Sequence, residues 1–527
     1  MADLFLPLML LGAACARSLP TVVIDAGTLV GTTTSFPSAT ATVNQFLGVP
    51  FAASPTRFGL AATPTPWTEP LAVAVRKPAC IQQFNYPLAS RKFARAIYNE
   101  PAPGESEDCL YLNIFAPSTQ PPEGGFTVMF WLYGGSLDFG NAGQPIYDGS
   151  RLAAYENVIL VSANYRMNIF GYPSSPELPL LGQNLGFFDM RLSLQWVQDN
   201  IAAFGGNPTK VTMFGNSAGA KAIDSLMVSY PKDPPFRAAI LQSGQGTIRS
   251  APGRNFSTKA WRNVTSTLNC TKGEDLACLR KVPATALKFV LEYNSLSFHP
   301  VVDNVTWFSD PYVRRLNGNV PNIPLLTGTN NDDGSILVAH RTNLTDFLLS
   351  KFPESPTYRK LLGEAYAVNT TISKGTLYNG TVSIGAIYTD YGSQCVQAMY
   401  ANQTLNAGAP TWRYYFNATF PNIQVYPRLG SYHGEEIYLA FTTFSQHDNV
   451  TTQEQGLSHT MRRAWPNFAK DPTGAGPGWN RLGSTAADVA LLGANGGTGV
   501  TMMPQGDLDD RCYLYASIFD SFLAGQM

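Results

Sequence analysis

The sequence has few charged residues and almost no net charge. Asp, Glu, Lys and Arg make up 14% of its 527 residues, where about 25% is usual in soluble domains. The 36 basic and 37 acidic side chains leave a net charge of −1. Because nucleic-acid-binding proteins need a basic stripe or patch, we expect no nucleic-acid partner. Because basic residues do not outnumber acidic ones, the composition also argues against a protein that binds membrane surfaces through a polybasic segment.

Long apolar runs and metal-binding patterns are missing as well. No stretch beyond the N-terminus approaches the about 20 apolar residues of a transmembrane helix, so we expect no membrane span. The sequence contains no Cys-x-x-Cys pair and no His-Glu-x-x-His. These absences exclude zinc-ribbon, thioredoxin-like and zinc-protease sites of those patterns, and we expect neither a metal nor a cofactor.

Apolar and aromatic residues are abundant instead. Hydrophobic residues make up 44% of the chain, with 30 Phe, 24 Tyr and 8 Trp. This content excludes disorder and is enough for a sizeable core.

The first 16 residues have the pattern of a secretory signal peptide. The run from Leu4 to Ala16 is apolar but too short to span a bilayer. Ala14 and Ala16 form a small-x-small cleavage pattern, so we predict a signal peptide over residues 1–16. Asp3 precedes the run where a basic residue is usual. A buried N-terminal strand or helix is the alternative.

Cysteines and sequons agree with secretion. Of seven cysteines, Cys15 lies in the predicted signal peptide and six remain. In an oxidising compartment six cysteines predict three disulfides, and 15 pairings are open. Ten Asn-x-Ser/Thr sequons predict a surface that can carry glycans. They are Asn255, Asn263, Asn269, Asn304, Asn343, Asn369, Asn379, Asn402, Asn417 and Asn449.

Apolar strands alternate with helical patterns over the first half of the chain. The predicted strands are 126–133, 158–165, 211–214 and 238–242, and the predicted helices are 189–204 and 218–228. This alternation predicts an α/β fold with a mostly parallel central sheet flanked by helices. In such sheets, ligands bind beyond the carboxyl ends of the strands.

One pentapeptide predicts a nucleophilic serine. Gly215-Asn216-Ser217-Ala218-Gly219 matches Gly-x-Ser-x-Gly, between an apolar strand and a helix-compatible stretch. This context is that of a nucleophile elbow, with Ser217 on a tight turn at a helix N-terminus. The alternative is an ordinary serine in a glycine-rich loop.

A serine nucleophile needs a base, and five histidines are available. His433 lies in a glycine-flanked loop after Ser217, where the order Ser, acid, His places the base. Position alone therefore favours His433. The alternatives are His299, His340, His447 and His459.

Blocks of sequence along nearly the whole mature chain form one ordered pattern. They are Gly48–Ala52, Ser106–Asn113, Tyr133–Gly140, Asn164–Arg166, Asn200–Pro208, the elbow, Gln242–Gly244, Pro300–Asp303, Asn331–Ser335, His433–Ile437 and Trp465–Ala469. In these blocks the chain resembles the carboxylesterase/cholinesterase branch of the α/β-hydrolases, and Tyr133–Gly140 is most similar to secreted fungal members. The resemblance implies an α/β-hydrolase fold and a single catalytic domain over residues 17–527.

The resemblance also implies a catalytic triad. It assigns Ser217 as the nucleophile, His433 as the base and Asp333 as the acid, where the family usually has glutamate. Because aspartate is one methylene shorter, either its loop lies closer to the base or the base shifts. The neighbouring Asp332 is the alternative acid.

An oxyanion hole is implied by the same comparison. Its backbone donors map to Gly135, Ser136 and Ala218, and Ser136 stands where the family has a third glycine. The alternative is that Gly134-Gly135 only ends a strand.

The resemblance selects one disulfide pattern and one ion pair. The implied disulfides are Cys80–Cys109, Cys270–Cys278 and Cys395–Cys512. The implied ion pair joins Arg57 to Glu107 beneath the first disulfide loop, where its role would be structural.

Departures from the cholinesterase pattern bear on the substrate. The loop between Cys80 and Cys109 has no Trp to hold a quaternary ammonium, and Asn216 replaces the usual glutamate. We therefore expect a secreted serine carboxylesterase acting on neutral carboxylic esters.

Two other interpretations remain open. The same loop carries Arg91, Lys92 and Arg95 among aromatic residues. It is either a fixed pocket wall or the mobile lid of a lipase that contacts lipid interfaces. A non-catalytic adhesion protein is disfavoured, because all three types of triad residue are present.

Overall fold

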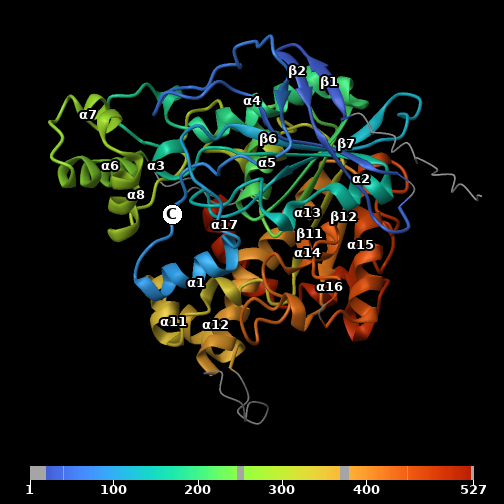
Figure 1. Cartoon of the computed structure of the whole chain (residues 1–527). Helices are drawn as coiled ribbons and strands as arrows, with labels where there is room; N and C mark the ends of the chain where they lie inside the picture. The colour runs from blue at the N-terminus through green and yellow to red at the C-terminus, as the bar shows by residue number, and fades with distance from the viewer. Residues whose placement is uncertain (1–18, 40, 246–253, 368–378, 448, 524–527) are drawn as a thin grey trace, which may run out of the picture.

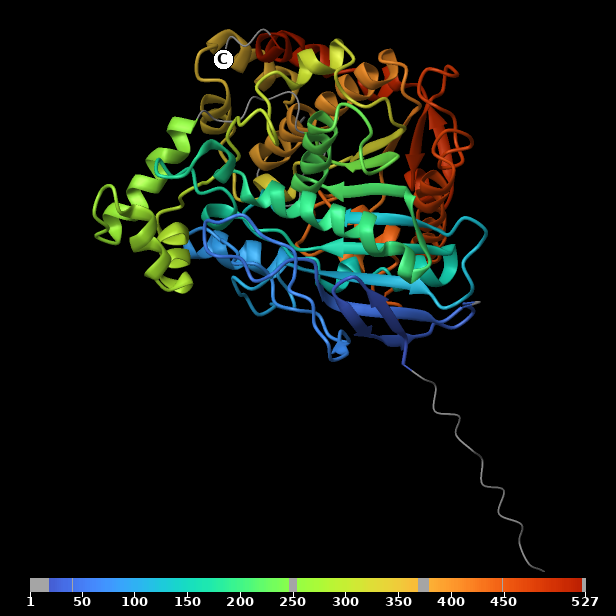
Figure 2. The ribbon, with the colours of Figure 1, turned by 90° about the horizontal axis from the view of Figure 1, so that it is seen from above.

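A large twisted sheet organises the chain. The computed structural model describes residues 19–39, 41–245, 254–367, 379–447 and 449–523, so the predicted signal peptide lies outside the described residues. Within them, eleven strands pair in the order β14-β13-β12-β11-β10-β9-β7-β8-β6-β4-β3. Figure 2 shows the sheet running from dark blue N-terminal strands at one edge to red C-terminal strands at the other.

The strands follow the apolar runs of the sequence. They are β3 (Thr32–Thr34), β4 (Val43–Pro50), β6 (Tyr111–Pro117), β7 (Phe126–Leu132), β8 (Val158–Ala163), β9 (Gly206–Asn216), β10 (Ala238–Gln242), β11 (Leu325–Asn330), β12 (Thr411–Phe416), β13 (Val489–Leu492) and β14 (Val500–Met503). Every residue of β7 and β8 is buried, as expected for strands covered on both faces. Strand β9 begins at Gly206, earlier than predicted, because Gly206 already pairs with Phe126.

The middle of the sheet is parallel and its margins are antiparallel. All neighbours from β8 through β7, β9, β10, β11 and β12 to β13 run parallel. Strands β14, β6, β4 and β3 pair antiparallel. The predicted mostly parallel sheet is confirmed. A separate small sheet joins β1 (Thr21–Ile24), β2 (Gly27–Val30) and β5 (Leu71–Ala72).

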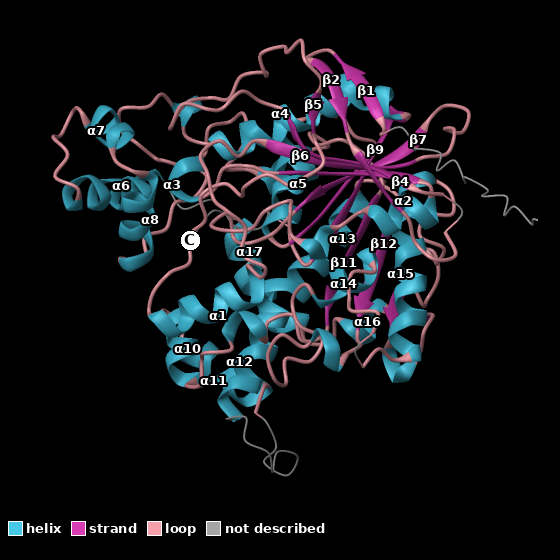
Figure 3. Cartoon of the chain, viewed as in Figure 1, coloured by secondary structure: helices cyan, strands magenta, loops and turns pink. Residues whose placement is uncertain are grey.

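Helices cover both faces of the sheet (Figures 1 and 3). Helices α2 and α15 pack against β6, β7, β8 and β9, while α4, α5 and α13 pack against β9 to β12. The helices are α1 (Leu88–Tyr98), α2 (Ser150–Glu156), α3 (Asn168–Gly171), α4 (Leu185–Asn200), α5 (Ala218–Ser229), α6 (Arg254–Thr267), α7 (Asp275–Lys281), α8 (Ala284–Tyr293), α9 (Pro311–Leu316), α10 (Leu344–Lys351), α11 (Pro356–Ala365), α12 (Asn379–Thr389), α13 (Cys395–Asn406), α14 (Glu435–Phe441), α15 (Thr452–Lys470), α16 (Gln505–Leu508) and α17 (Ala516–Leu523).

Three disulfides span sequence separations of 29, 8 and 117 residues. The structure forms Cys80–Cys109, Cys270–Cys278 and Cys395–Cys512, the pairs that the resemblance implied. Arg57 and Glu107 form the expected ion pair. None of the described helices is both long and apolar enough to cross a membrane.

Candidate active site

Ser217 occupies a strained turn between β9 and α5. Its backbone has φ 56° and ψ −120°, a conformation that costs a non-glycine residue of order 1–3 kcal/mol. A Cβ on Gly215 would lie 2.6 Å from the Leu132 carbonyl oxygen, and one on Gly219 would clash with the same oxygen. Glycine is therefore required on both sides of the turn. The turn places Ser217 at the carboxyl end of the sheet, directly before a helix N-terminus.

Asp333 and His433 meet across two loops. His433 Nδ1 lies 2.9 Å from Asp333 Oδ1, and both side chains are buried. Asp333 follows β11, and His433 lies just before α14. The sequence separates these residues by 100 positions, so only the fold brings them together.

Backbone contacts between the two loops explain why the short aspartate reaches the imidazole. The Asp332 N–H donates to the Ser431 carbonyl, and the Ser431 N–H donates to Asp332 Oδ2, each at 3.0 Å. Asn330 Nδ2 adds a 2.7 Å bond to the Tyr432 carbonyl. Asp332 therefore fixes the loop that carries His433, whereas Asp333 contacts the imidazole itself.

The surroundings of His433 favour its protonated form. Burial lowers the pKa of His433, but the charge of Asp333 and its hydrogen bond outweigh burial, so the pKa lies above the usual 6.5. The buried Nε2 has no hydrogen-bond partner among the described residues, and His433 lines the same pocket as Ser217. An imidazole held at Nδ1 and free at Nε2 is suited to accept a proton.

A second buried acid lies behind the triad candidates, and sequence reasoning gave it no role. Glu436 accepts hydrogen bonds from Asn330 Nδ2 at 2.6 Å, Gln242 Nε2 at 2.9 Å and Asn216 Nδ2 at 3.4 Å. Burial raises its pKa, and its charge in turn raises the pKa of His433. The signal was present in the sequence, since Glu436 belongs to the quoted block His433–Ile437.

The glycine loop, residues 134–140, lies opposite Ser217. Gly134, Gly135 and Ser136 line the pocket with Ser217, while Ala218 is the buried first residue of α5. The backbone is left-handed at Gly135, Ser136 and Leu137, with φ 111°, 59° and 63°. The loop therefore does more than end strand β7, because it turns back over the catalytic serine candidate.

The pocket lining mixes aromatic, aliphatic and small residues and contains few charged groups. It encloses about 880 Å³ including its open mouth. Its lining comprises Ile97, Tyr98, Glu100, Gly134, Gly135, Ser136, Phe139, Gly140, Gln144, Ile146, Tyr147, Asn216, Ser217, Leu337, Val425, Tyr432, His433, Gly434, Ile437 and Tyr438. Among these described residues, Glu100 is the one carboxylate, His433 is the one histidine, and none is Lys, Arg or Trp.

Helix α1 forms one wall of the pocket. Ile97 and Tyr98 face the cavity, and Phe93 packs on His340, with ring centroids 4.4 Å apart. Arg91 anchors the helix through an ion pair of 2.9 Å with Glu292 on α8, whose side chain is 4% exposed. None of the side chains of α1 is fully buried.

Comparison with known proteins identifies the family. The model of the carboxylesterase family matches residues 18–503. The chain belongs to the carboxylesterase family. Membership in this family makes it a carboxylic ester hydrolase with the α/β-hydrolase fold, as the resemblance implied.

Individual relatives of this carboxylesterase family member include cholinesterases and a lipase. Acetylcholinesterase of Bungarus fasciatus is 32% identical, over 84% of this chain and 78% of its own length. Cholinesterase of Mus musculus is also 32% identical, over 83% of this chain and 76% of its own. Secreted lipase 5 of Gibberella zeae is 28% identical, over 82% of each chain.

Proposed function

We propose that this family member is a secreted serine carboxylesterase that hydrolyses neutral carboxylic esters through an acyl-enzyme on Ser217. One observation carries the proposal: an imidazole held by Asp333 at 2.9 Å shares a pocket with a serine on a strained turn. Among the described residues, no group of three or more His, Cys, Asp or Glu side chains could hold a metal ion. A serine nucleophile activated by a histidine does not require a metal ion.

In the first half-reaction, His433 Nε2 takes the proton from Ser217 as its Oγ bonds to the ester carbonyl carbon. The negative charge that develops on the carbonyl oxygen is stabilised by the N–H groups of Gly135, Ser136 and Ala218. The tetrahedral intermediate then collapses, and the imidazolium protonates the departing alkoxide. Asp333 keeps Nδ1 protonated and stabilises the imidazolium in both steps.

In the second half-reaction, water replaces the alcohol. His433 takes a proton from water, whose oxygen attacks the acyl carbon bound to Ser217. Collapse of the second intermediate breaks the bond to Oγ, and His433 returns the proton to the serine. The carboxylic acid leaves, and the enzyme is restored.

The pocket supports an uncharged substrate. Its aromatic residues are Tyr98, Phe139, Tyr147, Tyr432 and Tyr438. Its polar groups besides the catalytic candidates are hydroxyls, amides and one exposed carboxylate, Glu100. A quaternary ammonium would lack the tryptophan face and the glutamate that the resemblance associates with choline esters. We therefore assign neutral esters rather than choline esters to this pocket.

Secretion is supported by several independent features. The chain forms three disulfides, which persist in oxidising compartments, and one relative is named a secreted lipase. Six sequon asparagines are exposed, namely Asn263, Asn269, Asn304, Asn343, Asn417 and Asn449, while Asn402 is partly exposed. The side chains of Asn255, Asn369 and Asn379 lie outside the described residues.

Glycans at these sequons would supply the surface polarity that charged side chains do not. Peptide-N-glycosidase treatment of the secreted protein should therefore lower both its mass and its solubility. An unchanged mass would contradict glycosylation.

A lipase is the second candidate, and the position of α1 favours it. The helix has no fully buried side chain and closes one side of the pocket. Exposed apolar residues, Leu337 and Tyr426, lie near it, and Tyr426 contacts Phe93 with ring centroids 5.2 Å apart. The buried anchor between Arg91 and Glu292 opposes a mobile lid, so the esterase remains our conclusion.

Purified enzyme tests the proposal directly. It should hydrolyse p-nitrophenyl acetate and butyrate faster than acetylthiocholine, and Ser217→Ala should abolish these activities. Faster turnover of acetylthiocholine would contradict the neutral-ester assignment. Ester hydrolysis that survives in Ser217→Ala would contradict the mechanism.

A further inference from the structure

The segment after Cys80 holds the far end of the glycine loop. The Gln83 N–H donates to the Asp138 carbonyl at 2.9 Å. The Gly140 N–H donates to Gln82 Oε1 at 2.8 Å. These contacts run from the first disulfide loop to the loop that carries the proposed oxyanion donors.

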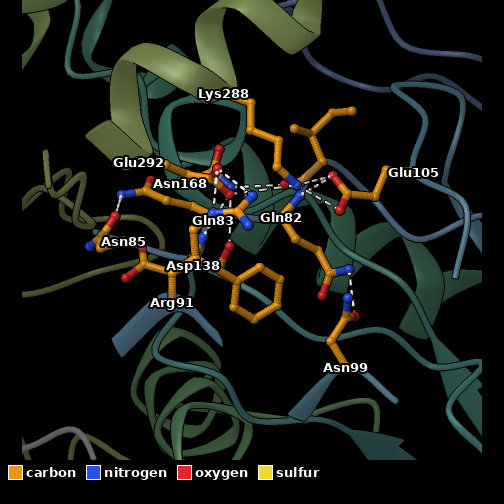
Figure 4. A network of polar contacts seen from close by, with 12 residues as sticks. Gln82, Gln83, Asn85, Arg91, Asn99, Glu105, Asp138, Asn168, Lys288 and Glu292 are labelled. Carbon is orange, nitrogen blue, oxygen red and sulfur yellow. Dashed lines mark hydrogen bonds and ion pairs between the residues drawn. The ribbon is translucent and has the colours of Figure 1, made fainter. Parts of the chain in front are cut away.

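The Gln82 amide has a single workable orientation. The Gly140 N–H can only donate, so the Gln82 amide must present its oxygen to Gly140 and its nitrogen to Asn99. Its Nε2 donates to Asn99 Oδ1 at 2.9 Å, as Figure 4 shows. Gln82 is 0% and Asn99 2% exposed, so neither amide has water as a ready replacement.

The backbone of Gln82 is fixed as well. Its N–H donates to Glu105 Oε2 at 3.1 Å, and Glu105 pairs with Lys288 at 2.6 Å (Figure 4). The disulfide of Cys80 precedes it in the chain. The Gln82 side chain therefore extends from a rigid base rather than from a free loop.

The position of Gly140 bears on the direction of the oxyanion donor of Ser136. The Gly135 carbonyl accepts from the N–H groups of Asp138 and Phe139 at 2.9 and 3.1 Å. Because a trans peptide is planar, the Ser136 N–H points opposite to that carbonyl. A displacement of residues 138–140 would therefore rotate the peptide that carries the Ser136 N–H.

The glycine loop needs such external support. Ser136 and Leu137 have φ of 59° and 63°, and left-handed backbone costs non-glycine residues of order 1–3 kcal/mol each. A strained backbone keeps its geometry only where its surroundings determine it. The Gln82 amide supplies one of these constraints at Gly140.

We infer that Gln82 is a positioning residue for the oxyanion hole, an inference that rests on the proposed function. It acts through Gly140 and the turn at Gly135, and touches no reacting atom. Through Asn99, the residue after Tyr98, the same amide also fixes the end of α1 that lines the pocket. One buried side chain thus sets the distance between the oxyanion donors and a wall of the substrate pocket.

Substitution at Gln82 tests the inference. Gln82→Leu removes the acceptor at similar size and should lower kcat for p-nitrophenyl butyrate by about 10- to 100-fold, the scale of a small misplacement. KM should change less than kcat, because loss of the Gly140 contact acts on the transition state, whereas loss of the Asn99 contact acts on one wall of the pocket. Binding of an alkyl trifluoromethyl ketone, which forms a tetrahedral adduct with a serine, should weaken in parallel.

Two further variants separate positioning from general damage. Gln83→Leu removes a neighbouring buried amide side chain that, among the described residues, bonds Asn85 and the Leu296 carbonyl. It keeps the backbone N–H that donates to the Asp138 carbonyl, and it should keep wild-type kcat. Gln82→Glu keeps an acceptor for Gly140, and should recover at least part of the lost kcat.

Several results would overturn the inference. Wild-type kcat in folded Gln82→Leu would do so, as would an equal loss in Gln83→Leu. If Gln82→Leu does not fold, Gln82→Asn replaces it, because its amide is too short to reach Gly140. Equal kcat in Gln82→Asn and Gln82→Glu would then overturn the inference. Activity that survives Ser217→Ala would instead overturn the proposed function beneath it.

Discussion

His433 Nδ1 lies 2.9 Å from Asp333 Oδ1, while the neighbouring Asp332 turns away to bind the backbone of Ser431. Two consecutive aspartates thus have different contacts: one orients the imidazole, and the other fixes the loop that carries it. An imidazole that donates its Nδ1 proton to a carboxylate has its free lone pair on Nε2. His433 lines the same pocket as Ser217. The division between these aspartates leads to the first prediction.

Replacing Asp333 should affect catalysis far more than replacing Asp332. Asp333→Asn should lower kcat by about 10³- to 10⁴-fold, because the amide can stabilise the wrong tautomer of His433. Asp332→Asn keeps an oxygen that can accept from the Ser431 N–H, so its kcat should fall much less than that of Asp333→Asn. Steady-state kinetics on p-nitrophenyl butyrate, with thermal unfolding as a check on folding, measures both. A larger loss of kcat in Asp332→Asn than in Asp333→Asn would contradict this assignment and indicate that Asp332 is the acid that orients His433.

The activity should decline on the acid side with a midpoint above 6.5, the ordinary pKa of histidine. The base must be neutral, and the charge and hydrogen bond of Asp333 raise the pKa of His433 above 6.5 despite burial. kcat/KM should therefore fall as pH drops through that raised pKa. Asp333→Asn removes the charge that raises the pKa of His433 most, while the charge of Glu436 still raises it, so the residual activity should fall at a lower pH than in the wild type. A pH-stat assay of a simple alkyl ester gives both profiles, and an unchanged midpoint would contradict this role of Asp333.

A tryptophan in the pocket should improve choline esters. Tyr98 lines the cavity and lies 5.3 Å from Phe139, ring centroid to ring centroid. Tyr98→Trp should raise the ratio of acetylthiocholine to p-nitrophenyl acetate kcat/KM by roughly twofold to thirtyfold, the range of one cation–π contact. Phe93→Trp makes a similar change on α1 outside the pocket and should leave the ratio unchanged. A fall in the ratio for Tyr98→Trp would count against this explanation of specificity.

Hydrolysis should show no activation at a lipid interface. Arg91 ties α1 to the buried Glu292, and the Gln82–Asn99 bond holds its other end. The rate with tributyrin should therefore saturate smoothly through the solubility limit of the substrate. An abrupt rise in rate above that limit would show a mobile α1 and favour the lipase. The rate with a soluble short-chain ester, measured in the same samples, serves as the control for denaturation of the enzyme at the lipid surface.

Local patterns in the sequence predicted much of the fold. The apolar runs that became β7 and β8 are buried on both sides, so periodicity and composition sufficed. The predicted helix over 189–204 corresponds to α4 and the 3₁₀ turn Ile201–Phe204 that follows it. The turn ends at Gly205, which adopts φ 83°, as the glycine punctuation indicated. The start of β9 was missed because pairing between Gly206 and Phe126, not local propensity, extends the strand.

The site could be predicted only as far as residue types and order allow. Ser217 was visible in its pentapeptide, and the position of His433 in a glycine-flanked loop after Ser217 already favoured it as the base. Asp333 was assigned through the family resemblance, because loops 100 residues apart leave no local signal that pairs them. The buried acid Glu436 and the amide of Gln82 were not assigned a role. Their significance depends on which backbone groups and side chains surround them after folding, and no spacing in the sequence shows this.

Covalent labelling of Ser217 tests the central claim most directly. A fluorophosphonate should inactivate the wild-type enzyme with one equivalent bound, and peptide mass spectrometry should locate the label on Ser217. Ser217→Ala should bind no label and show no ester hydrolysis. Stoichiometric inactivation with the label on another residue, or hydrolysis that continues after Ser217 is fully labelled, would contradict the account.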